Sequence, residues 1–160
     1  MTGTLNVRTR TGVVWYKWLI LAMFIVTIVT MIYTLIIRTP RAKQVAEQLQ
    51  QEFNSLAMFP QATATHSDKS YKDAQALIVS RYSTLASYPE LRAYYDTELP
   101  KHGWRFVSER TVTNWGRDPG GKTAHYCKGD WSADVEYIGR DTDGMSDYAL
   151  ALSWGINQCQ

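Results

Sequence analysis

Apolar positions divide the chain into one continuous hydrophobic run and a longer region where apolar and polar residues alternate. The run lies between Lys17 and Arg38 and reads WLILAMFIVTIVTMIYTLII, twenty residues without a charge. At about 1.5 Å of helical rise per residue, it is long enough to cross roughly 30 Å of bilayer hydrocarbon. A helix buried in a protein core would normally keep a polar face, and this run has none. The pattern predicts a transmembrane helix over residues 18–37, after an N-terminal tail of residues 1–17.

A cleaved signal peptide is the alternative interpretation of this run. Its apolar region would be shorter, about 7–15 residues, and small residues would mark a cleavage site. Here the run is followed by Arg38-Thr39-Pro40-Arg41, so we predict an uncleaved anchor. Basic residues flank the run on both sides, which leaves the positive-inside rule nearly balanced. Long C-terminal domains can translocate regardless of charge, and both cysteines follow the anchor. We therefore expect a protein of the inner (cytoplasmic) membrane with a cytoplasmic N-terminus and a periplasmic, extracytoplasmic domain.

One face of the membrane helix carries small and hydroxyl-bearing side chains among larger apolar ones. Met23, Thr27, Thr30 and Thr34 share this face. Such residues favour close packing between helices in lipid, which predicts other transmembrane subunits as partners. The alternative is that each threonine hydroxyl bonds to a carbonyl of its own helix, four residues earlier.

Two further helices are predicted by a period of three to four residues. Thr39 at the N-cap and Pro40 at the first helical position begin a juxtamembrane helix over residues 38–58. Its apolar stripe consists of Val45, Leu49, Phe53 and Leu56, and it favours packing on the domain over a free stalk. The second helix, about residues 88–102, begins with an S-x-x-E capping box. Its apolar face consists of Leu91, Tyr94, Tyr95 and Leu99, and Gly103 follows its end.

The remaining segments have the composition or the alternation of strands. Trp131, Ala133, Val135 and Tyr137 alternate with polar residues, a period of two that is typical of a half-buried antiparallel strand. Other expected strands are Ala62–Thr65 as a short edge strand, Gln75–Thr84, Trp104–Trp115, Lys122–Cys127 and Tyr148–Ile156. This order predicts an α+β domain over residues 59–160, with two layers and the helices on one face of a mostly antiparallel sheet.

A helix of the form Y-Y-x-x-x-L-x-x-x-G-W leads into a strand, and a strand ending in tyrosine and a serine cap precede it. These residues are Tyr82, Ser87, Tyr94, Tyr95, Leu99, Gly103 and Trp104, with Phe59-Pro60-Gln61-Ala62 upstream and Lys128-Gly129-Asp130 downstream. Over residues 59–156 the chain resembles small membrane-anchored or secreted bacterial domains of uncharacterised function. The resemblance implies a compact extracytoplasmic α+β domain and brings no catalytic residues.

The net charge of +2 conceals an uneven distribution. Six basic residues precede Glu47, whereas all 15 acidic residues and the other 11 basic residues lie at Glu47 or beyond, which gives that region a formal charge of −4. Phosphate contacts need clustered Lys and Arg, so the sequence argues against nucleic acid as a partner.

Residues 116–123 (GRDPGGKT) match the phosphate-binding pattern G-x-x-x-x-G-K-[ST]. A phosphate-binding loop must join a strand to a helix, because the helix N-terminus helps to hold the phosphates. Here the flanking segments are both predicted strands, and Asp118-Pro119-Gly120-Gly121 is typical of a turn. We interpret Gly116–Thr123 as a hairpin loop.

Two cysteines are the main candidates for covalent chemistry. In an oxidising compartment, Cys127 and Cys159 can form a disulfide; the alternatives are buried free thiols or a metal site completed by His125, for which no fourth ligand is evident. Asp141, Asp143 and Asp147 share a segment with Gly144 and could together hold Ca²⁺, but they lack the spacing of an EF-hand. We expect no bound metal and no cofactor.

No serine elbow of the form G-x-S-x-G and no evident pair of carboxylates indicates an enzyme. Trp104, Trp115, Trp131 and Trp154 all fall in predicted strands and belong either to the core or to a recognition surface. The hypothesis is a single-pass interaction protein, an accessory or assembly subunit of a larger membrane complex. The alternatives are a free-standing module that binds a small ligand or peptide, and a nucleotide-binding protein.

Overall fold

The chain consists of two units, residues 1–38 and residues 39–160. The computed structural model describes residues 11–33, 39–114, 117–138, 147–156 and 159. In the first unit, α1 (Thr11–Tyr33) is continuous, and its segment Trp15–Tyr33 is long and apolar enough to span a membrane. The side chains from Trp15 to Tyr33 are exposed on every side, and Phe24, for example, is 64% exposed. α1 is therefore a candidate single span. It begins earlier than residue 18, and residues 34–37 of the predicted span lie outside the described residues.

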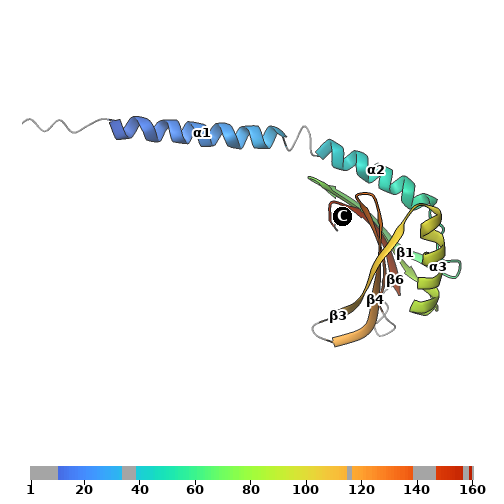
Figure 1. Cartoon of the computed structure of the whole chain (residues 1–160). Helices are drawn as coiled ribbons and strands as arrows, with labels where there is room; N and C mark the ends of the chain where they lie inside the picture. The colour runs from blue at the N-terminus through green and yellow to red at the C-terminus, as the bar shows by residue number, and fades with distance from the viewer. Residues whose placement is uncertain (1–10, 34–38, 115–116, 139–146, 157–158, 160) are drawn as a thin grey trace, which may run out of the picture. The chain divides into compact units, whose positions relative to one another are not determined.

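The second unit is built on a six-stranded sheet (Figure 1). The elements are α2 (Thr39–Ser55), β1 (Thr63–Lys72), β2 (Gln75–Ser83), α3 (Tyr88–Lys101), β3 (Arg105–Asn114), β4 (Arg117–Lys128), β5 (Trp131–Tyr137) and β6 (Tyr148–Trp154). The strand order is β1-β2-β6-β5-β4-β3, and every neighbouring pair is antiparallel. The fold is α+β, as predicted.

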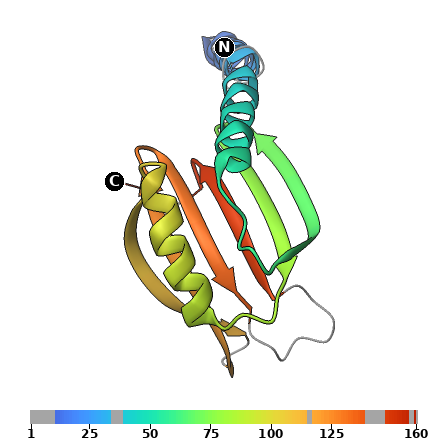
Figure 2. The same ribbon diagram turned by 90° about the vertical axis from the view of Figure 1, so that its right-hand side faces the viewer.

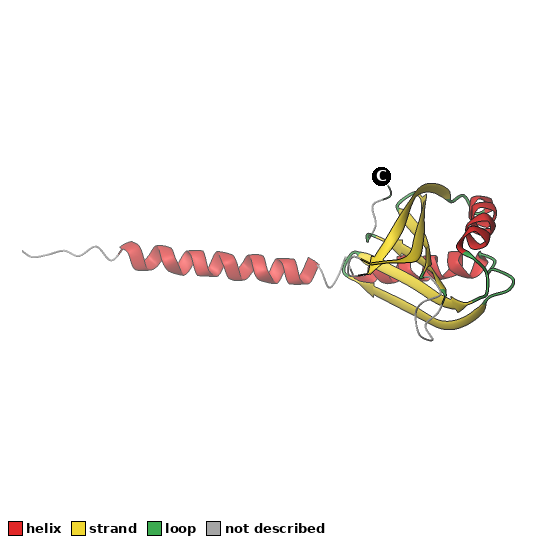
Figure 3. Cartoon of the chain, turned by 90° about the horizontal axis from the view of Figure 1, so that it is seen from below, coloured by secondary structure: helices red, strands yellow, loops and turns green. Residues whose placement is uncertain are grey.

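Both helices of this unit cover the same face of the sheet (Figure 2). α2 contributes Ala46 and Leu49, and α3 contributes Leu91, Tyr95 and Leu99, all fully buried. They form one cluster with strand residues that include Ile78, Tyr82, Tyr148, Leu150 and Leu152. The apolar stripe of α2 thus packs on the sheet, as its spacing predicted. Figure 3 distinguishes the helices from the strands by colour.

The ends of α3 show how local sequence sets its limits. The backbone N–H of Ser87 donates to the Glu90 carboxylate at 2.7 Å, which is one half of the predicted capping box. After the last turn, Gly103 adopts a left-handed φ of 82°, a conformation that glycine adopts without steric cost. The chain then reverses, so that Trp104 begins the approach to β3 with its side chain buried in the core.

Within the second unit, the predicted boundaries of β1, β4 and α2 differ from the structure by three residues or more. β1 runs from Thr63 to Lys72 and is exposed at every position, because it is an edge strand that pairs with β2 alone. β4 begins at Arg117, so the segment expected to be a hairpin loop is already paired with β3 through Gly121 and Val112. α2 ends at Ser55, before the predicted residue 58.

The face of the sheet opposite α2 and α3, the far face, carries mainly polar side chains. The strand registers align Ser108, His125, Asp134, Ala151, Val79 and Asp68 in one row across it. The next row contains Arg105, Cys127, Ser132, Ser153, Leu77 and Ser70. Consequently, the histidine and the strand-borne cysteine named in the sequence lie next to each other on the same face.

Candidate functional site

A disulfide joins Cys127, in β4, to Cys159, near the end of the chain. Their Cα atoms are 5.5 Å apart, within the usual range for a disulfide. The bond confirms the predicted pairing, and it ties the C-terminal segment to the far face of the sheet.

His125 and Asp134 form a hydrogen-bonded pair beside this disulfide. His125 Nδ1 lies 2.7 Å from Asp134 Oδ1, in the adjacent strand β5. His125 Nε2 lies 3.6 Å from Cys127 Sγ and 3.9 Å from Cys159 Sγ. Both polar side chains are largely buried, at 17% and 16% exposure. One ring nitrogen thus faces the carboxylate and the other faces the two sulfurs.

Asp134 was not among the residues predicted for this cluster. The sequence nevertheless contained enough information to predict it. The turn at Gly129-Asp130 places Lys128 opposite Trp131. That register carries back along the hairpin and places His125 opposite Asp134. A two-residue hairpin turn fixes strand register, so the pair followed from the turn and the alternation together.

A pocket of about 440 Å³ opens at the disulfide. Its lining includes both cysteines together with Gly103, Arg105, Val107, Lys128 and Gly129. The ammonium of Lys128 donates to Glu52 at 2.7 Å, so its charge is already balanced by a carboxylate from α2. A small molecule or ion can therefore reach the sulfurs from this side, and Arg105 is the exposed cation at the rim.

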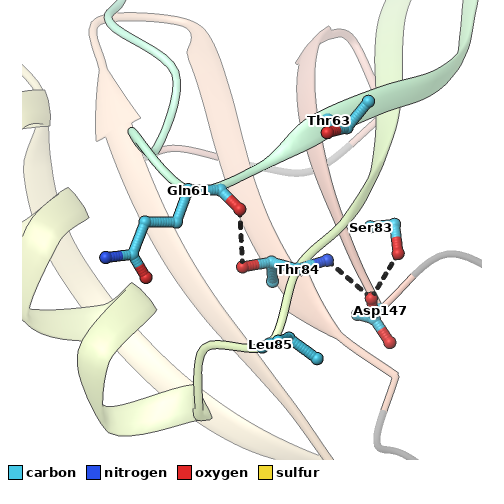
Figure 4. A pocket seen from close by; sticks show the side chains of 6 residues that line it. All are labelled: Gln61, Thr63, Ser83, Thr84, Leu85 and Asp147. Atoms are coloured by element: carbon cyan, nitrogen blue, oxygen red, sulfur yellow. Dashed lines mark hydrogen bonds between the residues drawn. The ribbon is translucent and has the colours of Figure 1, made fainter.

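A second pocket lies at the end of the sheet, near the start of β6 (Figure 4). Asp147 Oδ2 accepts hydrogen bonds from the Ser83 hydroxyl at 2.9 Å and from the Thr84 backbone N–H at 2.6 Å. The Thr84 hydroxyl in turn donates to the Gln61 carbonyl at 3.3 Å. Asp147 thus connects this strand end to the segment after β2. Asp141 and Asp143, which we considered with it as calcium ligands, lie outside the described residues.

The GRDPGGKT segment does not have the surroundings of a phosphate-binding loop. Residues 117–123 lie within β4, the strand continues to Lys128 where a phosphate-binding loop would lead into a helix, and Thr123 is 1% exposed. Lys122 Nζ is 3.4 Å from the hydroxyl of Thr111 on the paired strand. Gly116 lies outside the described residues. Lys122 and Thr123 are therefore placed as strand residues.

We predict that Lys122→Ala leaves the fold intact and changes the free energy of unfolding by less than about 0.5 kcal/mol, because the side chain makes one long surface contact. Unfolding in denaturant, followed by tryptophan fluorescence, measures this. Binding of ATP to the full chain should be undetectable before and after the change. Saturable ATP binding that the substitution abolishes would show that the segment does hold phosphate.

The tryptophans fall into different environments. Trp104 is 2% exposed, and its Nε1 donates to Glu52 at 3.0 Å, so it belongs to the core and not to a recognition surface. Trp131 and Trp154 are half-buried and pack at the edge of the same core. The guanidinium of Arg41 lies 5.4 Å from the Trp154 ring. Trp115 lies outside the described residues.

The threonine hydroxyls of α1 bond within their own helix. Thr27 Oγ1 donates to the Met23 carbonyl at 2.9 Å, and Thr30 Oγ1 lies within 3.0 Å of the Val26 carbonyl. Thr34 lies outside the described residues. Packing of this face against a partner helix stays a prediction, and the satisfied hydroxyls indicate that it would rely on the small size of these side chains.

Comparison of the chain with protein-family models, with curated proteins and with solved structures finds no match.

Proposed function

We propose that this chain is a single-pass interaction protein, an accessory or assembly subunit of a larger membrane protein complex. The observation that carries the proposal is α1, a continuous apolar helix whose side chains from Trp15 to Tyr33 are exposed to their surroundings on every side. Thr27 and Thr30, on the same face as Met23, are shorter than the leucine, isoleucine and phenylalanine side chains of the rest of the helix. Lipid provides no hydrophobic drive between helices, so such a face supports association by close packing.

The proposal includes an orientation, with residues 1–17 in the cytoplasm and residues 40–160 outside. The disulfide supports it, because disulfides persist in oxidising compartments. Protease added to right-side-out vesicles should therefore degrade the domain while a cytoplasmic marker stays intact. Full protection of the domain, with an outward-facing control protein digested, would reverse the orientation.

Partner binding through the membrane helix can be tested by making its small face bulky. We predict that Thr27→Leu, Thr30→Leu and Thr34→Leu together reduce the recovery of co-purifying membrane proteins at least several-fold after extraction in a mild detergent. The span stays apolar and still inserts, but leucine keeps a partner backbone at a distance. Quantitative mass spectrometry of the purified chain measures the effect.

The matched control changes the opposite face of α1 by Ile25→Leu, Val29→Leu and Ile32→Leu, and it should leave recovery unchanged. If a stoichiometric partner is retained equally by both triple variants, α1 is only an anchor. If the wild-type chain is extracted alone, the subunit proposal fails and a free-standing binding module is the better description.

A further inference from the structure

We propose that Cys127, Cys159 and His125 form a metal site when the disulfide is reduced, and that this site binds Zn²⁺ with a water as fourth ligand. The three side chains are grouped on the far face, and their ligand atoms lie within 4.8 Å of one another. Two thiolates and an imidazole are ligands that zinc prefers. This proposal concerns a second property of the domain and does not rest on the proposed role as a subunit.

The distances already suit a tetrahedral ion. With Zn–S bonds of about 2.3 Å and Zn–N bonds of about 2.0–2.1 Å, a tetrahedron separates nitrogen from sulfur by about 3.6 Å and sulfur from sulfur by about 3.8 Å. His125 Nε2 is 3.6 Å from Cys127 Sγ and 3.9 Å from Cys159 Sγ. The imidazole therefore needs no large movement, and only the two sulfurs must separate. Cys127 is held in β4, whereas Cys159 lies outside the strands, so Cys159 makes this movement.

Asp134 prepares the histidine for this role. When Nδ1–H donates to Asp134 Oδ1 at 2.7 Å, the lone pair of neutral His125 is on Nε2, the atom that faces the sulfurs. Histidine ligands in metal sites usually donate their other nitrogen to a carboxylate or carbonyl in this way, which fixes the ring and its tautomer.

The disulfide is converted to a zinc site in two steps, reduction and metal binding. An external dithiol reduces the Cys127–Cys159 bond, supplies two electrons and two protons, and is itself oxidised to a disulfide. Zn²⁺ then replaces the two thiol protons, which leave to solvent. The two thiolates neutralise the charge of the ion. The nearby ammonium of Lys128 is paired with Glu52, so its charge is already balanced. The pocket of about 440 Å³ at the sulfurs gives water access to the fourth position.

The test compares the oxidised and the reduced full chain in detergent micelles, with a phosphine as the reductant and Zn²⁺ or Co²⁺ as the probe. The reduced chain should bind one ion per chain, and the Co²⁺ form should show the absorption of a tetrahedral thiolate site. The oxidised chain should bind none. We expect Asp134→Asn to weaken binding about 10–100-fold, and His125→Gln to weaken it further.

The chain contains a matched control for the histidine–carboxylate pair. His66 Nε2 and Asp68 Oδ2 lie 3.4 Å apart in the exposed strand β1, and no cysteine lies in that strand. The double change His66→Gln and Asp68→Asn should leave the affinity for Zn²⁺ unchanged. Circular dichroism of each reduced variant shows whether the domain is folded.

Three results would overturn the proposal: no stoichiometric ion in the reduced wild type, equal binding by the oxidised chain, or unchanged affinity in both Asp134→Asn and His125→Gln. The last result would also identify binding by two cysteines in an unfolded chain, because such binding does not depend on the arrangement around Asp134. None of these measurements involves a protein partner, so they are independent of the test of the subunit role.

Discussion

Replacing Cys127 and Cys159 together with serine should lower the free energy of unfolding of residues 39–160 by about 3–4 kcal/mol. The two cysteines are 32 residues apart, and the bond closes the segment that contains β5 and β6. In the chain-entropy account, the loss of stability comes mainly from the unfolded state. Without the cross-link, the unfolded chain has more conformational entropy, which favours unfolding. The folded sheet keeps its registers, because both strands pair on both sides.

Denaturant unfolding, followed by tryptophan fluorescence, measures this loss. Wild-type chain with its disulfide reduced, in a metal-free buffer, is the matched control and should unfold at the same denaturant concentration as the double serine variant. A difference of less than about 0.5 kcal/mol between the oxidised wild type and the variant would mean that the C-terminal tie does not stabilise the fold.

The disulfide-bonded form and the reduced, zinc-bound form should both stabilise the fold. An ion that binds the folded, reduced chain stabilises it in proportion to the logarithm of its concentration over the dissociation constant. Zn²⁺ should therefore return part of the stability that reduction removes, and it should do nothing for the double serine variant. The same far-face site would hold the C-terminal segment by a covalent bond in one state and by a metal ion in the other.

The sequence predicted best those elements whose signals are local. The limits of α3 depend on Ser87, Glu90 and Gly103, which act within a few residues of the helix ends. One face of β5 meets the helices and the other face is polar. Apolar and polar residues therefore alternate along its sequence, and this period of two could be recognised without the structure. The disulfide was predicted from two cysteines that follow the anchor, together with the expectation of an extracytoplasmic domain.

What the sequence did not predict depends on partners far along the chain. β1 has no buried position, so no hydrophobic pattern marks it, and backbone pairing with β2 alone defines its length. The turn-like composition of residues 118–121 concealed the first part of β4, which pairs with β3 at Arg117 and Gly121, before pairing with β5 begins at Lys122. Trp104 was ambiguous between core and surface, because the partner of its indole N–H, Glu52, lies 52 residues away in the sequence.

Replacing Trp104 with alanine should be the most damaging single change in the domain, with a loss of about 3–5 kcal/mol in the free energy of unfolding. Its side chain is among the largest that are fully buried. Its Nε1 donates to Glu52 Oε1 at 3.0 Å, and the same oxygen accepts from Lys128 Nζ at 2.7 Å. Alanine would therefore leave a cavity and also remove one partner of a carboxylate that joins α2 to β4.

Two further substitutions separate these contributions. Trp104→Phe keeps most of the apolar volume and removes the donor, so it should cost roughly 1–2 kcal/mol, which isolates the hydrogen bond to Glu52. Trp154→Ala is the matched control, because Trp154 is half-buried beside Arg41 and its removal opens no enclosed cavity. Denaturant unfolding of the three variants should rank Trp104→Ala well below the other two. If Trp104→Ala is no worse than Trp154→Ala, the junction of α2, α3 and β4 does not determine the stability of the domain.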